Sequence, residues 1–256
     1  MKNLFKITLV SCILFVATSI AQITNRGEAI NKAGKQRILV MKMAKSYMAI
    51  GAGVKVADAK QELYEASMLF NENINDLNIF IEFKETNDAL TAAGVLWTKF
   101  RADVNSTPNI DMAPSIMLQA NNLVNACNVV VDKYVANIGV KIAVLPNVCA
   151  KQRLYAQKIG MLYLAKFWDV KSPTLKRDLN ETLANYETSL TSLLQYAENT
   201  EEINTILKLQ QSEWNFTKKS FNADAEQMAP VLVYSSANLM THNFDTATVL
   251  YAKLIN

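Results

Sequence analysis

The chain has 256 residues, half of them hydrophobic, and its 26 basic residues outnumber its 23 acidic residues by only three. This balance gives no reason to expect a nucleic acid or a strongly acidic partner. Only 7 Gly and 5 Pro occur, so turns should be few and regular elements long, which favours helices over a strand-and-turn fold.

The N-terminal segment has the pattern of a secretory signal peptide. Lys2 and Lys6 precede an apolar stretch at 7–21, and small residues lead up to Ala21. The alternative is an uncleaved anchor helix, but about 15 apolar residues are short for a bilayer, which needs about 20. We therefore expect residues 1–21 to be removed and the protein to be periplasmic or secreted, with no membrane span after cleavage.

The remainder of the chain repeats itself at an offset of 116 residues, with no gap needed. The sequence AGKQR at 33–37 aligns with CAKQR at 149–153, and Met-Ala-Pro at 112–114 aligns with Met-Ala-Pro at 228–230. Self-similarity at one fixed offset indicates an internal duplication. We therefore expect three parts: a signal peptide at 1–21, a first module at 22–138 and a second module at 139–256.

Each module is expected to form four helices. Apolar residues recur at spacings of three and four in a stripe that begins at Leu63, and again in its counterpart that begins at Leu179. Trp97 and Trp214 miss the repeat register by one residue, which indicates a local shift in the third helix. Short connections predict an all-α fold of two tandem antiparallel four-helix bundles. The expected helices are 26–52, 57–84, 87–105 and 111–137 in the first module, and 144–169, 173–198, 200–221 and 227–254 in the second.

A short apolar segment, NIGVKIAVLP at 137–146, joins the modules, so they should dock rather than swing on a flexible tether. Cys127 and Cys149 flank this segment and form an even pair in an oxidising compartment. If the chain turns back here, a disulfide between them is feasible, whereas a straight helix would separate them by about 33 Å and forbid it. Two buried free thiols are the alternative.

The Lys-Gln-Arg box at the start of each module is the strongest candidate for a functional site. On a helix, Arg37 and Arg153 are flanked mostly by small or apolar residues, so this face should meet another helix. A guanidinium there needs carbonyls, a carboxylate or a bound anion. Its fork suits a small oxyanion or a carboxylate, and Gln36 and Gln152 add neutral hydrogen-bonding groups beside it. In the alternative, both arginines pair with bundle carboxylates and only stabilise the fold, the candidates being Glu65 and Glu181.

The first box resembles the opening of the PilJ/NarX-type sensor domain, the extracytoplasmic input module of type IV pilus chemotaxis transducers and nitrate sensor kinases. The residues that match its pattern are Asn31, Ala33, Gly34, Gln36, Arg37, Lys42, Met43, Ala44 and Lys45. The second module matches at Ala150, Gln152, Arg153, Gln157, Lys158 and Ile159. The resemblance covers both modules. It weakens directly after Arg37, where Ile-Leu-Val-Met replaces the Met-x-Ser-Gln run that is frequent in the family.

The resemblance implies a sensory or ligand-binding protein that is not an enzyme. In nitrate-sensing members, the arginine of the box contacts the anion where the first helices of two subunits meet. By this resemblance, the candidate anion site consists of Arg37 and Arg153, with Gln36 and Gln152 beside them. One chain would supply both halves of this site. The competing function is a structural adaptor of the cell envelope, with an envelope protein as partner and no small ligand.

No pattern in the chain points to a cofactor, a metal or a catalytic site. His242 is the only histidine, which is too few for a typical metal site, and the C-x-x-C-H attachment sequence for haem is missing. The ten methionines are more typical of core packing than of a cofactor box. Gly-rich phosphate loops and a Ser-His-Asp order are also missing. We therefore expect neither an enzyme nor a bound cofactor.

Overall fold

The structure, a computed structural model, describes residues 23, 26–80, 83–138, 144–222 and 227–253, and these form helices and turns with no strand. The expected signal peptide and the middle of the apolar linker lie outside the described residues. None of the helices in the described ranges is both long enough and apolar enough to cross a membrane.

Eight α-helices are present in the described part of the chain, and each corresponds to a predicted one. The first half contains α1 (Arg26–Gly51), α2 (Val56–Ile79), α3 (Lys84–Val104) and α4 (Ala113–Ile138), with a 3-10 turn η1 (Ile110–Met112) before α4. The second half contains α5 (Val144–Phe167), α6 (Leu175–Leu194), α7 (Glu201–Thr217) and α8 (Pro230–Lys253), with a 3-10 turn η2 (Lys218–Asn222) after α7.

The predicted helix ends are least accurate where local backbone geometry stops a helix early. α2 ends at Ile79 rather than near residue 84, because Phe80 leaves the helical region with φ −92° and ψ 50°. α6 ends at Leu194 rather than near 198, and the chain turns quickly into α7, whose first turn is capped by Thr200. The Thr200 side chain accepts a hydrogen bond from the backbone N–H of Ile203, as an N-cap residue does.

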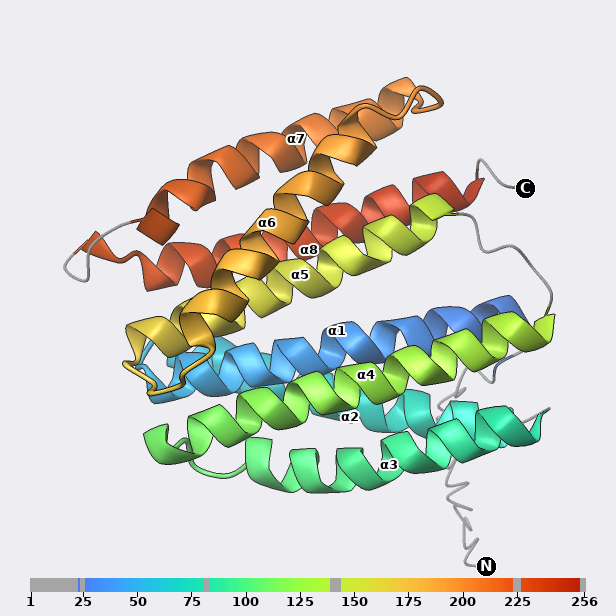
Figure 1. Cartoon of the computed structure of the whole chain (residues 1–256), viewed down its shortest axis with the longest axis horizontal. Helices are drawn as coiled ribbons and strands as arrows, with labels where there is room; N and C mark the ends of the chain where they lie inside the picture. The colour runs from blue at the N-terminus through green and yellow to red at the C-terminus, as the bar shows by residue number, and fades with distance from the viewer. Residues whose placement is uncertain (1–22, 24–25, 81–82, 139–143, 223–226, 254–256) are drawn as a thin grey trace, which may run out of the picture.

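The first helices of the two halves, α1 and α5, lie at the centre of the molecule (Figure 1). α1 packs on α2 and α4, α5 packs on α6 and α8, and α1 and α5 pack on each other. Every residue from Gln36 to Ala49 is buried except Lys42, and every residue from Ala156 to Ala165 is buried except Lys158. A helix buried on all sides carries apolar residues on all faces, and this explains why α1 and α5 lack a one-sided apolar stripe.

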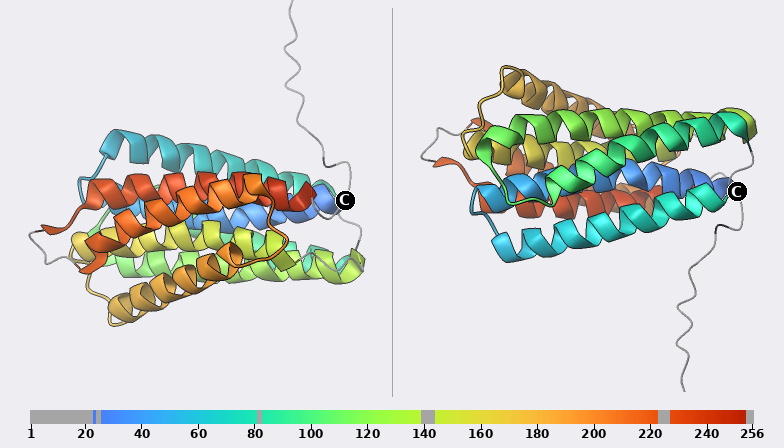
Figure 2. Two further views of the ribbon diagram at one scale, coloured as in Figure 1. Left: turned by 90° about the horizontal axis from the view of Figure 1, so that it is seen from above. Right: turned by 90° about the horizontal axis from the view of Figure 1, so that it is seen from below.

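The outer helices cover the central pair from both sides. α3 packs on α4 and α7 packs on α8, while α6 crosses α5 at a steep angle and diverges from the long axis (Figures 1 and 2). α1 and α5 start at the same end of the molecule and run in the same direction (Figure 1). Equivalent residues of α1 and α5 are therefore brought to similar heights along the shared interface.

Two tyrosines that are 116 residues apart make similar contacts in the two halves. The hydroxyl of Tyr47 accepts a hydrogen bond from the N–H of Asn109 at 3.0 Å, in the loop before η1 and α4. The hydroxyl of Tyr163, which lies 116 residues later, accepts one from the N–H of Ala229 at 2.9 Å, directly before α8. Each tyrosine thus links the first helix of its half to the segment before the fourth helix, although the donors Asn109 and Ala229 are not 116 residues apart.

The two displaced tryptophans also take equivalent places. The ring centroids of Phe70 and Trp97 are 4.1 Å apart, and those of Tyr186 and Trp214 are 4.6 Å apart. Phe70 and Tyr186 are 116 residues apart, whereas Trp97 and Trp214 are 117 apart. The tryptophans stack on equivalent rings. The second half therefore accommodates one more residue than the first before α7, without a change in this part of the core.

Candidate functional site

The two glutamines of the boxes hold the first helix of each half to the second. Nε2 of Gln36 donates to the backbone carbonyl of Phe70 on α2 at 3.1 Å, and Nε2 of Gln152 donates to that of Tyr186 on α6 at 2.9 Å. Both side chains are buried, and Oε1 of each accepts no hydrogen bond from the described residues. The donors of both glutamines are therefore already used within the fold.

The two arginines point the other way, toward the fourth helix of their own half, and their partners differ. Nε of Arg37 donates to the carbonyl of Gly34 at 3.2 Å, and Nη1 donates to Oδ1 of Asn128 on α4 at 3.0 Å. Nη1 of Arg153 forms an ion pair with Asp245 on α8, while its Nε has no partner among the described residues. Both hydrogen-bond acceptors of Arg37 are therefore neutral, whereas Arg153 meets a carboxylate.

The pairing of these arginines with Glu65 and Glu181 is wrong. Glu65 is exposed on α2 and accepts a hydrogen bond from Gln61 at 2.7 Å, and Glu181 is exposed on α6, 3.9 Å from Arg177. Neighbouring residues on a helix point about 100° apart. The glutamine of each box therefore takes the side facing the second helix, and the arginine faces the fourth.

The electrostatic surroundings of Arg37 are unfavourable for its charge. Arg37 is only 8 % exposed, and burial lowers its pKa. The charge of Arg153 across the α1–α5 interface lowers this pKa further, and Cys127 and Asp132 oppose the shift weakly. Both burial and the charge of Arg153 thus disfavour the charged form of Arg37.

A second polar cluster lies further along α1, and sequence reasoning missed it. Lys45 is completely buried, with Nζ 2.8 Å from Oε1 of Glu62 on α2 and 4.3 Å from the ring centre of Tyr234 on α8. The same Nζ donates to Oδ1 of Asn238, also on α8. Burial lowers the pKa of Lys45 to about 8, although Glu62 opposes the shift.

The cluster around Lys45 connects the two halves of the molecule. Tyr234 and Asn238 of α8 donate to Oε2 of Glu62, the latter at 3.0 Å, and Gln157 of α5 donates to Oδ1 of Asn238 at 3.1 Å. Burial acts to raise the pKa of Glu62, but the charge of Lys45 outweighs it with other nearby groups, and the net shift is downward. A charged carboxylate therefore joins α1 and α2 to α8.

This cluster has no counterpart at the equivalent place of the duplication. The residues 116 positions from Lys45 and Tyr234 are Met161, which is fully buried, and Leu118, which is 61 % exposed. The same fold therefore accepts an apolar side chain where α1 carries Lys45. The repeat alignment contains one indication of this site, because it pairs Lys45 with Met161.

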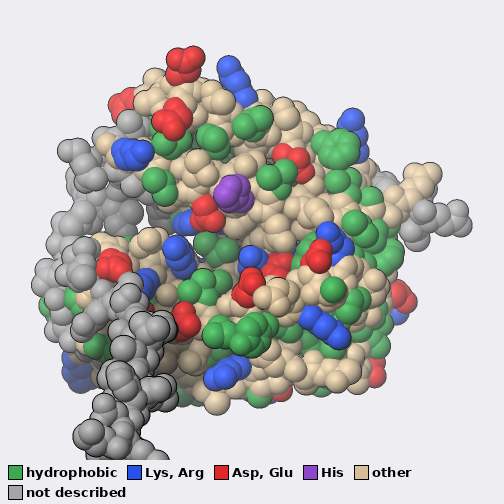
Figure 3. Space-filling view, turned by 180° about the vertical axis from the view of Figure 1, so that it is seen from behind, with side chains coloured by type: hydrophobic (Ala, Val, Ile, Leu, Met, Phe, Trp, Pro, Cys, Tyr) green, Lys and Arg blue, Asp and Glu red, His purple; other side chains and the backbone are tan. Residues whose placement is uncertain are grey.

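An open groove of about 600 Å³ lies beside the Lys45 cluster, between α2 and α8. Its lining includes Glu62, Tyr234 and Asn238 from the cluster, together with Lys42, Gln61 and Glu65. Figure 3 shows side chains of both charges gathered across the middle of the rear face, between the two halves. The groove therefore presents cations and anions close together rather than one sign of charge.

Cys127 and Cys149 are free thiols, so the disulfide that the sequence allowed is not formed and the alternative of two buried thiols holds. Cys127 packs in the apolar cluster around α1 and α4, whereas Cys149 packs in the separate cluster around α5 and α8. The two side chains therefore belong to different cores. Burial raises the pKa of each thiol to about 12.

We expect both thiols to resist alkylation in the folded protein, because a buried neutral thiol is a poor nucleophile. Iodoacetamide at pH 8 should leave Cys127 and Cys149 unmodified in buffer and modify both in denaturant, as measured by peptide mass spectrometry. Omitting the reductant is the control for oxidation. A peptide pair joined through these cysteines in the unreduced sample would contradict the structure.

No group of three or more His, Cys, Asp and Glu side chains suited to a metal ion is found within the described ranges. The glutamines of the boxes, Gln36 and Gln152, thus bond to the second helices, the arginines, Arg37 and Arg153, bond to the fourth helices, and the Lys45 cluster lies beside the α2–α8 groove. Comparison of the chain with protein-family models, with curated proteins and with solved structures finds no match.

Proposed function

We propose that this chain is an exported, non-enzymatic ligand-binding protein, built from two tandem four-helix modules similar to the PilJ/NarX-type sensor domain. Its ligand is a small oxyanion or carboxylate bound between α1 and α5. The observation that supports this most is the state of Arg37: the residue is buried, both of its hydrogen-bond acceptors are neutral, and the charge of Arg153 lowers its pKa further. A buried charge without a counter-charge is costly, and a bound anion would offset both the desolvation and the repulsion.

The packing of the central helices supports a site formed by one chain. α1 and α5 contact each other and run in the same direction, and the charge of Arg153 lowers the pKa of Arg37. This is the arrangement that the family resemblance implies for the first helices of two subunits. In this proposal the duplication replaces a dimer, and no second copy of the chain is needed.

Arg37 is the main ligand contact in this proposal. Arg153 is already paired with Asp245, whose side chain is 51 % exposed and can turn into solvent. An anion at the interface competes with Asp245 for Arg153 but has no carboxylate to displace at Arg37. We therefore expect the loss of Arg37 to weaken binding more than the loss of Arg153.

Isothermal titration calorimetry with nitrate, nitrite and acetate tests the proposal. At least one of these anions should bind, and Arg37→Ala should weaken binding about tenfold or more, because a charge-assisted hydrogen bond is lost. Arg37→Lys should recover little, since an ammonium lacks the guanidinium fork. Arg177→Ala, which removes an exposed arginine of α6, is the matched control. Failure of all three anions to bind, or unchanged binding in Arg37→Ala, Arg153→Ala, would refute the proposal.

A structural adaptor of the cell envelope is the second candidate. It is favoured by an open groove of about 670 Å³ between α2 and α3, where Tyr64 and Met68 are 59 % and 45 % exposed beside the indole of Trp97. Exposed aromatic and methionine side chains are typical of protein-binding surfaces. A variant Tyr64→Ser, Met68→Ser that loses association with an envelope protein, while anion binding is undetectable, would support this role instead.

A further inference from the structure

The open groove between α2 and α3 carries one cation and one anion. Both helices lie on the side of the molecule that the right-hand view of Figure 2 shows from below. Only two of the ten residues that line the groove are charged, Glu72 on α2 and Arg101 on α3, and both are exposed. The lining also includes the exposed side chains of Tyr64 and Met68. The groove therefore combines two accessible charges of opposite sign with an apolar surface.

Neutral groups direct Arg101 across the groove toward α2. Its Nη1 donates to Oδ1 of Asn71 on α2 at 3.5 Å, and its guanidinium carbon lies 6.0 Å from the ring centre of Trp97. Arg101 forms no ion pair with a described residue, and neither does Glu72. Within the described ranges, each of the two charges of the groove thus lacks a counter-charge at ion-pair distance.

The second half of the molecule neutralises the equivalent charge internally. The stacked tryptophans are 117 residues apart, and at this offset Arg101 corresponds to Lys218, while Asn71 corresponds to Glu187 at the offset of 116. Nζ of Lys218 lies 3.0 Å from Oε1 of Glu187 on α6. In the first half an amide takes the place of this carboxylate, so the charge of Arg101 stays available to an outside group.

The apolar surface of the groove also distinguishes the first half. Tyr64 and Met68 correspond to Asn180 and Ala184, which are polar or small. Aromatic and methionine side chains are enriched where proteins bind each other. The same fold forms without them in the second half, so their exposure in the first half favours a role in binding.

We propose that the α2–α3 groove binds the same groove of a second copy of this chain, about a two-fold axis that runs along the groove. The contact between Arg101 and Asn71 places Arg101 at about the same height along the helices as Glu72, which follows Asn71 on α2. Rotation about an axis parallel to the helices preserves height and sets α2 of one copy opposite α3 of the other. Glu72 of each copy then meets Arg101 of the other in two identical ion pairs.

The charges of the groove favour a second copy over other occupants. A simple anion would gain Arg101 but approach the carboxylate of Glu72, and a simple cation would meet the reverse. A two-fold interface is complementary to itself, so a second copy supplies the partners of both charges at once. The exposed side chains of Tyr64 and Met68 are buried in the same contact. This dimer goes beyond the proposed anion site, which one chain forms alone.

The size of this surface predicts a weak dimer. α3 has 21 residues, which corresponds to a length of about 31 Å, and two adjacent helices are about 20 Å wide. The resulting face of about 600 Å² per copy is at the lower end of the area that specific complexes bury. We therefore expect a dissociation constant on the order of 10 μM.

Sedimentation equilibrium of the purified chain at about 1–200 μM, a range that brackets this dissociation constant, tests the proposal. The unmodified chain should dimerise. Arg101→Glu and Glu72→Arg should each weaken dimerisation about tenfold or more, because each change replaces two ion pairs by like-charge contacts. Mixing these two variants should restore dimers, and so should the charge swap Arg101→Glu, Glu72→Arg within one chain. Lys218→Glu, the equivalent change in the second half, is the matched control and should leave dimerisation unchanged.

Three results would overturn the proposal. The first is a monomer at every concentration, as expected if the groove were reserved for a different protein. The second is a charge swap that fails to restore dimers although its melting temperature is unchanged. The third is a Lys218→Glu variant that weakens dimerisation as much as Arg101→Glu does.

The anion site is tested separately from the dimer. Arg37→Ala, Arg153→Ala should still dimerise, and Arg101→Glu should keep the anion affinity of the unmodified chain. Loss of dimers in Arg37→Ala, Arg153→Ala with an unchanged melting temperature would place the contact at the central helices and would also contradict the proposal.

Discussion

Replacing Lys45 by methionine is expected to lower the free energy of unfolding by about 3–5 kcal/mol, because it leaves a buried carboxylate without its counter-charge. Glu62 would keep its hydrogen bonds from Tyr234 and Asn238 but lose the cation 2.8 Å away. Met161, at the equivalent position of α5, shows that a methionine fits this kind of helix interface. The lost free energy of unfolding would therefore come from the missing charge and not from a poorly fitting side chain. Denaturant unfolding at pH 7 measures it.

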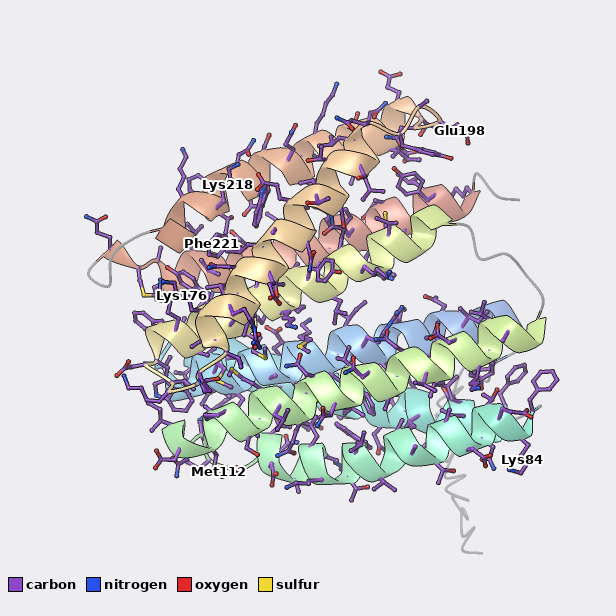
Figure 4. The ribbon with its side chains drawn as sticks, in the orientation of Figure 1. Lys84, Met112, Lys176, Glu198, Lys218 and Phe221 are labelled. Atoms are coloured by element: carbon purple, nitrogen blue, oxygen red, sulfur yellow. The ribbon has the colours of Figure 1, made fainter. Side chains whose placement is uncertain are left out.

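A second change should rescue this variant. In Lys45→Met, Glu62→Gln the amide oxygen can still accept from Tyr234 and Asn238, and no buried charge remains, so most of the lost free energy should return. Lys84→Met is the control, because Lys84 lies at the surface (Figure 4), is 83 % exposed and pairs with Asp88 on its own helix. It should change stability little. Equal effects of Lys45→Met and Lys84→Met would show that the buried pair contributes no stability.

The pH dependence of the same pair has a defined sign. The pKa of Glu62 is lower in the folded protein than its ordinary value of 4.5. Its ionised form is therefore favoured by folding, and this contribution is complete above pH 4.5 and is lost as the pH falls through the folded-state pKa. The stability difference between the unmodified protein and Lys45→Met should accordingly shrink as the pH is lowered below 4.5.

The helices could be predicted from the sequence because their signals are local. Apolar spacing and the repeat located all eight, and the errors lie at the ends: α2 stops where Phe80 leaves the helical backbone, and α6 and α7 stop about four residues earlier than predicted. The central place of α1 and α5 was not predicted, although the sequence analysis expected the arginine face of each to meet another helix. The packing of one half on the other is long-range and was anticipated only as docking across a short linker.

The candidate site could be predicted only in part, because the partners of its residues lie far away in the chain. The boxes identified Gln36 and Arg37 as buried groups, but nothing local shows that Arg37 reaches Asn128 or that Arg153 reaches Asp245. The burial of Lys45 could not be predicted for the same reason. Lys42 and Lys45 look alike in sequence, and only the packing of α5 and α8 decides that one is half-buried and the other completely enclosed.

The space for Lys45 depends on a glycine of the opposite helix. A Cβ atom built on Gly160 of α5 would lie 2.9 Å from Cδ of Lys45 and 3.0 Å from Cβ of Ala237 on α8. The lysine side chain can shift slightly, but Cβ of Ala237 is fixed to its backbone. The equivalent residues in the other half are Ala44 and Met161, so alanine is accepted where the facing residue is not a lysine.

Gly160→Ala is therefore expected to destabilise the protein by about 1–3 kcal/mol through overpacking, although alanine favours a helix over glycine by about 1 kcal/mol. Gly94→Ala on α3 is the matched control, because an added Cβ there meets nothing within 4 Å. That change should stabilise the protein by about 0.5–1 kcal/mol. The same substitution at two helical glycines should thus have opposite signs in denaturant unfolding. A stabilising Gly160→Ala would contradict the close packing of α5 between Lys45 and α8, and with it the enclosure that makes the buried charge of Lys45 costly.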